Sequence, residues 1–516
     1  MSFRISARAT GMITAGALAL TLAGCQSAVE LENSGGGNAS SEPVDGGTLV
    51  IAQSTDAQPV NVLAGRAGNA GWASNVFETL TVRDADGEPQ PLLATDWTVA
   101  DDGLSIDITL REGVTFHTGR ELTADDVKFS LENLTESASQ VAFIAQQFDA
   151  IEVTSPTSLT VTFQNEIPNL FDLFEYAYIL DEETIGGLED GSQVVGTGPF
   201  TFASWSPGSE ISLERNDDYW GEKAHLDGID IAVIPDSTAM LNAVRSDRAQ
   251  VAIGMSSQDV QALESNSAYR VTTSVGAGSV YPFGLNIEEA PFDTAEVRRA
   301  VQTAIDRERI ANQIFGDAAT PTALMWGADT VGYPEDLADA YAYDPESAKK
   351  TIDEAGAAGT KVEINVISIP DNTSVAEIVR NNLEEVGLDP EINIVETQDF
   401  GPRQIAGDLG QSFLPLHGLN GLSPFSLMST LPSLREGNSS KFWTDEYADL
   451  RDALGAAQTE EETATALHDL SQYLIDEAFT ANIVRVDAQY VEAADLQGLT
   501  WSGRGYLDAG SAYISE

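Results

Sequence analysis

The sequence predicts a protein of the α/β class, and three observations support this prediction. Hydrophobic and polar residues alternate in several short runs, which is typical of half-buried strands. Other segments combine an N-terminal capping residue with apolar residues at helical spacing. A strand, helix and strand follow one another between residues 361 and 395, and this order favours a right-handed βαβ crossover with a parallel strand pair. At 516 residues with 42% hydrophobic content, we expect two or three packed lobes rather than one core.

The chain begins with an export signal, which we assign to residues 1–24. Arg4 and Arg8 precede an apolar run that ends in Leu-Ala-Gly-Cys. The run is shorter than the roughly 20 residues needed to span a bilayer, and its charged-then-apolar order is typical of a signal peptide. The ending resembles the lipobox of bacterial lipoproteins, in which the cysteine becomes the first residue after cleavage and carries the lipid. We therefore expect Cys25, the only cysteine, to be a lipid acceptor rather than a buried structural thiol.

Residues 25–47 are expected to form a flexible tether. The stretch "ENSGGGNASSEPVDGG" is polar, rich in glycine and serine, and without apolar periodicity. Such a segment cannot bury enough surface to fold.

The charge balance excludes one large class of function. Lys and Arg total 26 against 81 Asp and Glu, so the formal net charge is −55. A field of that sign repels phosphate backbones and anionic head groups, so we expect no nucleic-acid partner and membrane contact through the lipid alone. A hydrated surface suited to salty surroundings is favoured over a surface that collects cations.

The first strands of the body follow from simple alternation. In "SIDITLRE", Ile106, Ile108 and Leu110 alternate with polar residues, which predicts a half-buried strand. Two further runs in residues 151–163 flank Ser-Pro-Thr-Ser, and this pattern indicates a β-hairpin.

The stretch "GVTFHTGRELTADDVKFSLENL", residues 113–134, is either an acid/base cluster or the boundary between a strand, a turn and a helix. Thr123 occupies the N-cap position, and Asp126 lies three residues later, where a capping-box partner belongs. Asp125 also complements the positive end of the helix. His117 is expected to be a hydrogen-bonded structural residue. The window therefore predicts local structure rather than catalysis.

Two later helices have similar start signals. Asp293 and Glu296 repeat the capping pattern ahead of an apolar stripe. In "YDPESAKKTIDEAG", Asp344 is the expected cap, Pro345 takes the first helical position and Gly356 ends the helix.

No catalytic constellation emerges from the sequence. The four histidines are far apart and no H-E-x-x-H motif occurs, so we expect neither a metal site nor a cofactor. The S-x-x-K match at Ser347 lies within the helix just described and lacks its S-D-N and K-T-G partners. A G-x-S-x-G elbow, a P-loop and a complete G-x-G-x-x-G are also missing. Adjacent acids are expected by chance among so many, so no catalytic residues are assigned.

Several segments in order carry a family resemblance. The stretch "LLATDWTVADDGLSIDITLREGVTFHTGRELTADDVKFSLE" resembles a characteristic region of the family 5 extracellular solute-binding proteins, the peptide and nickel binders of ABC importers. The segments beginning "VVGTGPFTFASWSPGSE", "FGLNIEEAPFDTAEVRRA" and "YDPESAKKTIDEAG" resemble later parts of the same family, as do "NSSKFWTDEYADLRDAL" and "ALHDLSQYLIDEAFTANIV". The resemblance extends over nearly the whole body from Gly47.

The resemblance implies a clamshell of the type II periplasmic-binding-protein kind: two α/β lobes joined by a hinge, with an extra domain inserted in the N-terminal lobe. By that pattern lobe I comprises residues 48–78, 191–280 and 488–516. The extra domain comprises residues 79–190, and lobe III comprises residues 281–487. A ligand would be buried where the lobes meet.

The resemblance also directs attention to one loop in lobe III. Peptide binders of the family hold the peptide α-ammonium with an acidic residue a few positions before an acidic residue and a proline. In "PLHGLNGLSPFSLM", counting back from Pro424 puts Asn420 in the place of that acid and Ser423 before the proline. Asn420 still accepts a hydrogen bond from an ammonium, and it also suits a neutral amide, hydroxyl or carbonyl group. The departure leaves the ligand open.

Other pocket contributors are expected near the lobe junction. They are Gln53, Ser54 and Asp56 after the first strand, Trp72 in the next loop, Tyr281 and Phe283 at the crossover, and His417 beside Asn420. Aromatic residues there either stack on a ligand or belong to the core, and core is the stronger reading for Phe283. Asp56 either pairs with a ligand cation or closes a turn. Nickel is disfavoured because His417 has no second histidine or cysteine nearby.

The sequence thus predicts a substrate-binding lipoprotein on the outer face of the cytoplasmic membrane of a bacterium. It would capture a peptide or another small organic solute and deliver it to the permease of an ABC importer. The alternatives are a receptor for an oligosaccharide or a nickel chelate, a secreted hydrolase, and a structural or sensory surface lipoprotein.

Overall fold

The computed structural model describes residues 43–515 except 65–66, 85–86, 138 and 189. The predicted signal peptide, Cys25 and most of the predicted tether lie outside the described residues. All elements below belong to one compact unit, residues 43–516. None of the helices in the described part is both long and apolar enough to cross a membrane.

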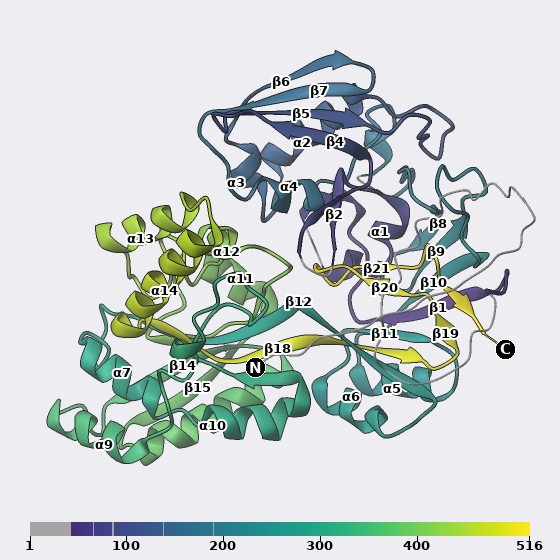
Figure 1. The fold of residues 1–516 in the computed structure, drawn as a ribbon. Helices are drawn as coiled ribbons and strands as arrows, with labels where there is room; N and C mark the ends of the chain where they lie inside the picture. Colours follow the sequence, from purple (N-terminus) through teal and green to yellow (C-terminus); the bar gives the residue numbers. More distant parts are fainter. Residues whose placement is uncertain (1–42, 65–66, 85–86, 138, 189, 516) are drawn as a thin grey trace, which may run out of the picture. The chain divides into compact units, whose positions relative to one another are not determined.

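A twelve-stranded sheet forms the centre of this unit (Figure 1). Its continuous path runs β15 (Asp389–Val395), β14 (Lys361–Ile367), β16 (Ser412–Leu414), β12 (Tyr269–Leu285), β18 (Thr480–Ala493), β11 (Val251–Ile253), β1 (Thr48–Gln53), β10 (Gly228–Val233), β9 (Glu210–Arg215) and β8 (Phe200–Ser206). The short strands β13 (Ala319–Pro321) and β17 (His417–Gly418) pair with β18 and β12 outside this path.

Strands β12 and β18 connect the two halves of the sheet. They are antiparallel partners of 17 and 14 residues, much longer than the other strands, and Figure 1 shows them running side by side. Their register shifts between Ser274 and Ser279 and again between Val280 and Pro282. Both expected crossover points, 280/281 and 487/488, lie within these two strands. Each half of the sheet therefore depends on the same pair of strands.

In the first half, β1 lies between two parallel neighbours, β10 and β11. Strands β10, β9 and β8 continue the sheet in antiparallel fashion. Helices α5 (Ser237–Arg245) and α6 (Ser257–Glu264) begin at Asp236 and Ser256, whose side chains accept backbone N–H groups of the first turn. Their apolar faces pack against β1, β11 and β18 in a core that includes Met240, Val244 and Val491.

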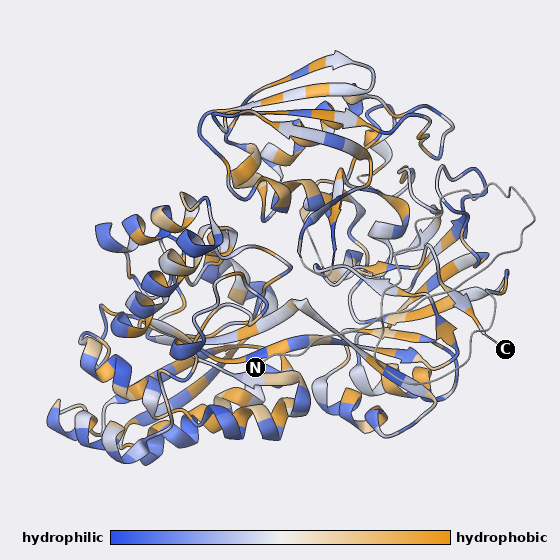
Figure 2. Ribbon diagram, viewed as in Figure 1, coloured by the Kyte–Doolittle hydropathy of each residue, from blue (hydrophilic) through white to orange (hydrophobic). Residues whose placement is uncertain are grey.

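A separate four-stranded antiparallel sheet lies within residues 94–163. Its order is β4 (Ala94–Val99), β5 (Ser105–Leu110), β7 (Ser158–Phe163) and β6 (Phe148–Ser155). The half-buried strand at 105–110 and the hairpin at 151–163 are both confirmed. Figure 2 shows the alternation of hydrophobic and hydrophilic residues along these strands. The buried residues of β5 face helix α2 (Ala124–Glu136) across a shared core.

The opening of α2 confirms that its acids are capping residues. The Asp126 carboxylate accepts hydrogen bonds from the backbone N–H and the hydroxyl of Thr123, both at 3.0 Å. Arg120 lies beside Asp126 and Asp181, forming ion pairs with both buried carboxylates. His117 accepts from Gly196 N through Nδ1 and bonds Gly198 O through Nε2 at 3.0 Å, and burial lowers its pKa. The window is a folded joint and not an acid/base cluster.

The second half confirms the predicted βαβ unit. Strands β14 and β15 are parallel and are joined by helix α10 (Pro370–Glu385). Helix α9 (Pro345–Glu354) starts as predicted, since Asp344 accepts from Ser347 N at 2.9 Å, and Gly356 follows its end with φ +69°. Helix α7 (Ala295–Thr303) corrects one prediction, because its N-cap is Thr294 rather than Asp293. Thr294 has the extended backbone that precedes a helix, and Asp293 lies one residue too early.

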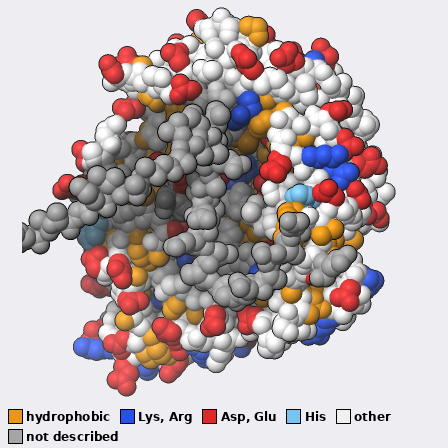
Figure 3. Space-filling view, turned by 45° about the vertical axis from the view of Figure 1, so that its right-hand side comes forward, with side chains coloured by type: hydrophobic (Ala, Val, Ile, Leu, Met, Phe, Trp, Pro, Cys, Tyr) orange, Lys and Arg blue, Asp and Glu red, His pale blue; other side chains and the backbone are white. Residues whose placement is uncertain are grey.

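The remaining elements are short or peripheral. The helices are α1 (Ala73–Val76), α3 (Ala142–Ala145), α4 (Leu170–Tyr176), α8 (Arg307–Ile310), α11 (Thr397–Ile405), α12 (Pro424–Thr430), α13 (Asp445–Gly455) and α14 (Glu460–Glu477). Three two-stranded ribbons pair β2 (Thr81–Arg83) with β3 (Pro89–Pro91), β19 (Leu496–Gln497) with β22 (Tyr513–Ile514), and β20 (Thr500–Trp501) with β21 (Leu507–Asp508). Acidic side chains are spread over the described surface in Figure 3, where basic ones are fewer.

The joint at the start of α2 yields a stability prediction. Replacing Asp126 by Ala (Asp126→Ala) removes the capping acceptor and leaves Arg120 with one carboxylate fewer, so the free energy of unfolding should fall by about 2–3 kcal/mol. Asp125→Ala is the matched control, because Asp125 is exposed in the same helical turn and should cost less than about 1 kcal/mol. Urea unfolding followed by circular dichroism measures both; equal losses would contradict the capping role.

Candidate functional site

The predicted pocket residues after β1 are engaged within the protein. Gln53 is buried; its amide donates to Thr55 O and Gly68 O, and its Oε1 accepts from Gly71 N at 3.0 Å. The hydroxyl of Ser54 lies 3.4 Å from that of Thr55. In this structure these groups hold the loop that follows β1. A ligand role for Gln53 and Ser54 stays a prediction.

Asp56 and Trp72 also support the first half of the fold. The Asp56 carboxylate accepts from Trp205 Nε1 at 2.9 Å and from Gly208 N at 2.6 Å, which ties the loop to the β8–β9 hairpin. The Trp72 side chain is fully buried and meets Phe202 edge to face, with ring centroids 5.2 Å apart. Of the two alternatives for Asp56, the closing of local structure is the one these contacts represent.

The crossover residues lie in or beside the second core. Phe283 is fully buried, and Tyr281 packs on Phe315 with ring centroids 4.9 Å apart. His417 is buried, pairs with Val280 through the backbone, and shares a 2.7 Å hydrogen bond with Ser433 Oγ. Burial lowers the pKa of His417 to about 4, so the ring is neutral at physiological pH.

Asn420 occupies a different environment, at a contact between distant parts of the chain. Its φ is +53°, in the left-handed region, so its loop is sharply turned. The side-chain amide donates to Gln140 Oε1 at 2.9 Å, and the backbone carbonyl accepts from the Tyr176 hydroxyl at 3.0 Å. Both partners belong to residues 79–190. The loop proposed from the sequence therefore meets the expected extra domain through polar groups.

A buried acid reinforces this contact at the start of α12. Asp172, in α4, accepts from the backbone N–H and hydroxyl of Ser423 and from the hydroxyl of Ser426, at 3.2, 2.7 and 2.6 Å. Its other oxygen pairs with Arg83 at 2.7 Å. An acid at the N-terminus of a helix is favourable. The acidic group absent from position 420 is thus matched by one from the other side of the contact, where it serves the protein itself.

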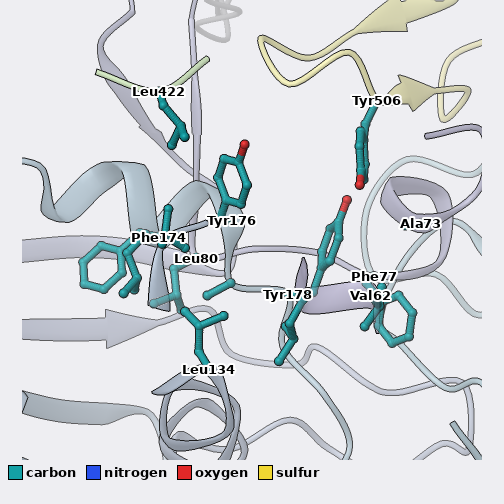
Figure 4. Close-up of a cluster of buried hydrophobic side chains, with 14 of the residues drawn as sticks. Val62, Ala73, Phe77, Leu80, Leu134, Phe174, Tyr176, Tyr178, Leu422 and Tyr506 are labelled. Atoms are coloured by element: carbon teal, nitrogen blue, oxygen red, sulfur yellow. The ribbon is translucent and has the colours of Figure 1, made fainter. Parts of the chain in front are cut away.

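Beneath the Asn420 loop lies a buried arginine surrounded by tyrosines. The Arg504 guanidinium carbon lies 3.8 Å from the ring centroid of Tyr176, 5.2 Å from that of Tyr178 and 4.7 Å from that of Tyr506. We call these four residues the Arg504 cage. Figure 4 shows the three tyrosines together, with the hydroxyl ends of Tyr178 and Tyr506 pointing toward each other and Leu422 above Tyr176. Arginine over aromatic faces is a favourable cation–π arrangement.

Three glycines allow the Asn420 loop to approach the cage closely. Gly421 has φ +68°, and its N–H donates to Gly276 O at 2.8 Å. A Cβ at position 421 would lie 3.1 Å from the Gly503 carbonyl group, and one at position 276 would lie 2.9 Å from the same oxygen. The main chains of the Asn420 loop, of β12 and of the segment before Arg504 therefore meet with little side-chain material between them.

The sequence did not single out the cage. Gln140, Asp172 and the tyrosines lie in stretches that look like ordinary amphipathic structure. The one usable signal is Arg504 itself, an arginine between two glycines and before a tyrosine in a chain where acids outnumber basic residues about threefold. In the described part of the chain, no three His, Cys, Asp or Glu side chains are grouped to hold a metal ion.

These features define a class of protein: two α/β halves built on a shared pair of long strands, with polar and aromatic residues where the halves meet. Residues 88–438 match the family model of the bacterial extracellular solute-binding proteins, family 5. The chain belongs to this family, whose members are substrate-binding proteins of transport.

Characterised relatives span more than one ligand class. The chain is 28% identical over 422 residues to di/tripeptide-binding protein 2 of Pseudomonas aeruginosa, covering 75% of this chain and 79% of that protein. It is 25% identical over 440 residues to heme-binding protein A of Haemophilus influenzae, covering 78% and 80% respectively.

A solved structure confirms the fold class. The periplasmic binding protein DppA of Helicobacter pylori, in complex with the peptide STSA, superposes with a TM-score of 0.78 and covers 92% of this chain and 99% of its own. At 23% identity this likeness concerns the fold. The predicted two-lobed, type II arrangement is therefore correct.

The buried His417 yields a pH prediction. Its pKa of about 4 lies below the ordinary value of 6.5, so between these values the unfolded chain binds the proton and the folded protein does not. The free energy of unfolding should therefore fall as pH drops from 6.5 toward 4, by up to about 3 kcal/mol from this residue. His417→Gln should remove that part of the slope. Denaturation of both proteins at several pH values tests this; parallel curves would refute it.

Proposed function

We propose that this protein is the receptor of an ABC importer, capturing a peptide or another small organic solute between its lobes and delivering it to a membrane permease. The observation that carries the proposal is the match of residues 88–438 to the solute-binding family. The similarity to a di/tripeptide-binding protein supports a peptide as the first candidate. In this proposal the ligand is released unchanged, and no catalytic residue is required.

The shared strands supply a physical basis for capture. Two connections between lobes form a hinge about which the lobes open and close. Strands β12 and β18 are those connections, and the register shifts in their pairing between 274 and 282 interrupt the regular ladder. The Asn420 loop and the Arg504 cage lie on facing sides of the contact, so opening would separate them and expose the cage. Ligands bind preferentially at such interfaces.

Other ligands and other functions remain as defined alternatives. Asn420, in place of an acid, suits neutral solutes such as oligosaccharides, and a relative is named for heme. A nickel chelate is disfavoured because His417 is buried and bonded to Ser433. A secreted hydrolase would have to convert its ligand. A structural or sensory lipoprotein would bind none.

Ligand screening tests the proposal. The mature body, residues 43–516, should be stabilised by di- to octapeptides, and a ligand at about 100 times its Kd should add roughly 2.7 kcal/mol to the free energy of unfolding. Thermal shift measures this against oligosaccharides, heme and nickel chelates as parallel arms. Mass spectrometry of the recovered ligand should find it intact. No stabilisation by any solute, or a converted ligand, would overturn the receptor proposal.

Membrane attachment follows as a separate prediction. In a bacterial host that processes lipoproteins, the full chain should take up a labelled fatty acid and sediment with membranes. Cys25→Ser should abolish both, because the thiol is the proposed acceptor. Ser27→Ala, two residues away, is the matched control and should behave as the parent does. Equal labelling of the Cys25→Ser variant would exclude this attachment.

A further inference from the structure

One edge of the Arg504 guanidinium has no acceptor. The side chain is 7% exposed, and Nη1 donates to the Glu175 backbone carbonyl at 2.8 Å. Nε and Nη2 are buried and find no hydrogen-bond partner among the described residues. A buried donor without an acceptor costs about 1–3 kcal/mol, and more when it is charged. Such a group in a folded protein calls for a specific explanation.

A second buried arginine illustrates the normal arrangement. Arg307 is 7% exposed as well. Its Nε donates to Asn482 O at 3.0 Å, Nη1 donates to Gln302 O at 2.7 Å, and Nη2 donates to Gln302 Oε1 at 3.2 Å. All three nitrogens are therefore used. The comparison shows that this fold satisfies a structural arginine in full, and that Arg504 differs.

The acids nearest to the cage are already committed. Glu175 directs its carboxylate to Arg83, with a 3.0 Å contact to Nε. Asp172 binds Arg83 and the start of α12. Arg504 itself forms no ion pair with an acid in the described residues. The cage thus holds a buried positive charge that the protein's own carboxylates leave uncompensated.

We propose that the free edge of Arg504 binds a carboxylate group of the solute. Nε and Nη2 form the side of the guanidinium that meets both oxygens of a carboxylate in two parallel hydrogen bonds. The three tyrosine rings would enclose the rest of that end of the ligand. This inference rests on the proposed receptor function and specifies the ligand: a peptide with a free C-terminal carboxylate, or another small organic acid.

The neutral residue at position 420 fits the same proposal. Asn420 and Arg504 lie on either side of Tyr176, which donates to the backbone carbonyl of Asn420 and stacks on the guanidinium. A site with an unpaired cation and an amide, and without an uncommitted acid, favours an anionic end of the ligand over an ammonium group. Recognition would then be anchored at the acid end.

Matched ligand pairs test this. Trialanine and tetraalanine with free carboxylates are compared with the same peptides amidated at the C-terminus, and maltobionate is compared with maltose. Calorimetry on the body 43–516 should give the acids a Kd about 10- to 100-fold lower than their neutral counterparts. Arg504→Gln should remove this preference, and Arg504→Lys should restore only part of it, because an ammonium lacks the planar fork.

Arg451→Gln is the control variant, since Arg451 also stacks on an aromatic ring, that of Trp443, but in α13. It should keep the full preference for acids. If acids and neutral counterparts bind the parent equally, the inference fails while the receptor function stands. A preference that survives in Arg504→Gln also overturns it. If neither these probes nor the solutes of the wider screen bind, the receptor proposal fails and the inference with it.

Discussion

The antiparallel pairing of β12 with β18 is the constraint on which the rest of the structure depends. Strands from residues 48–53 and 200–253 extend the sheet on one side of this pair, and strands from residues 361–414 extend it on the other. The pair is therefore part of both halves and also their connection. Its regular ladder is broken only between Ser274 and Pro282. Movement of one half relative to the other is confined to the conformational freedom that these few residues allow.

Electrostatic pairing follows a clear economy in so acidic a chain. Buried carboxylates recur with a guanidinium beside them: Asp172 and Glu175 with Arg83, Asp126 and Asp181 with Arg120, and Glu492 with Arg270. An isolated buried charge is costly, so scarce arginines are placed where acids leave water. Arg504 reverses the pattern, since it is the cation that lacks a carboxylate. This reversal distinguishes a residue that serves a ligand from those that serve the fold.

Local features were predictable from the sequence, and long-range ones were not. The cap at Asp126, the start at Asp344 and the βαβ unit depend on residues a few positions apart, and all three are confirmed. The start of α7 was misplaced by one residue because Asp293 and Thr294 both suit a cap. Asn420 was placed by family resemblance alone. Its partners Gln140 and Tyr176 are 280 and 244 positions away, so no local pattern joins them.

The meeting of Gly276, Gly421 and Gly503 has an evolutionary consequence. Where the halves touch at these positions, the contact is made by main chain, and main chain is the same whatever side chains surround it. Neighbouring positions are then free to diversify toward new cargo without disturbing the seam. Relatives of similar architecture that carry cargo as unlike as short peptides and a porphyrin are what such a division of labour allows.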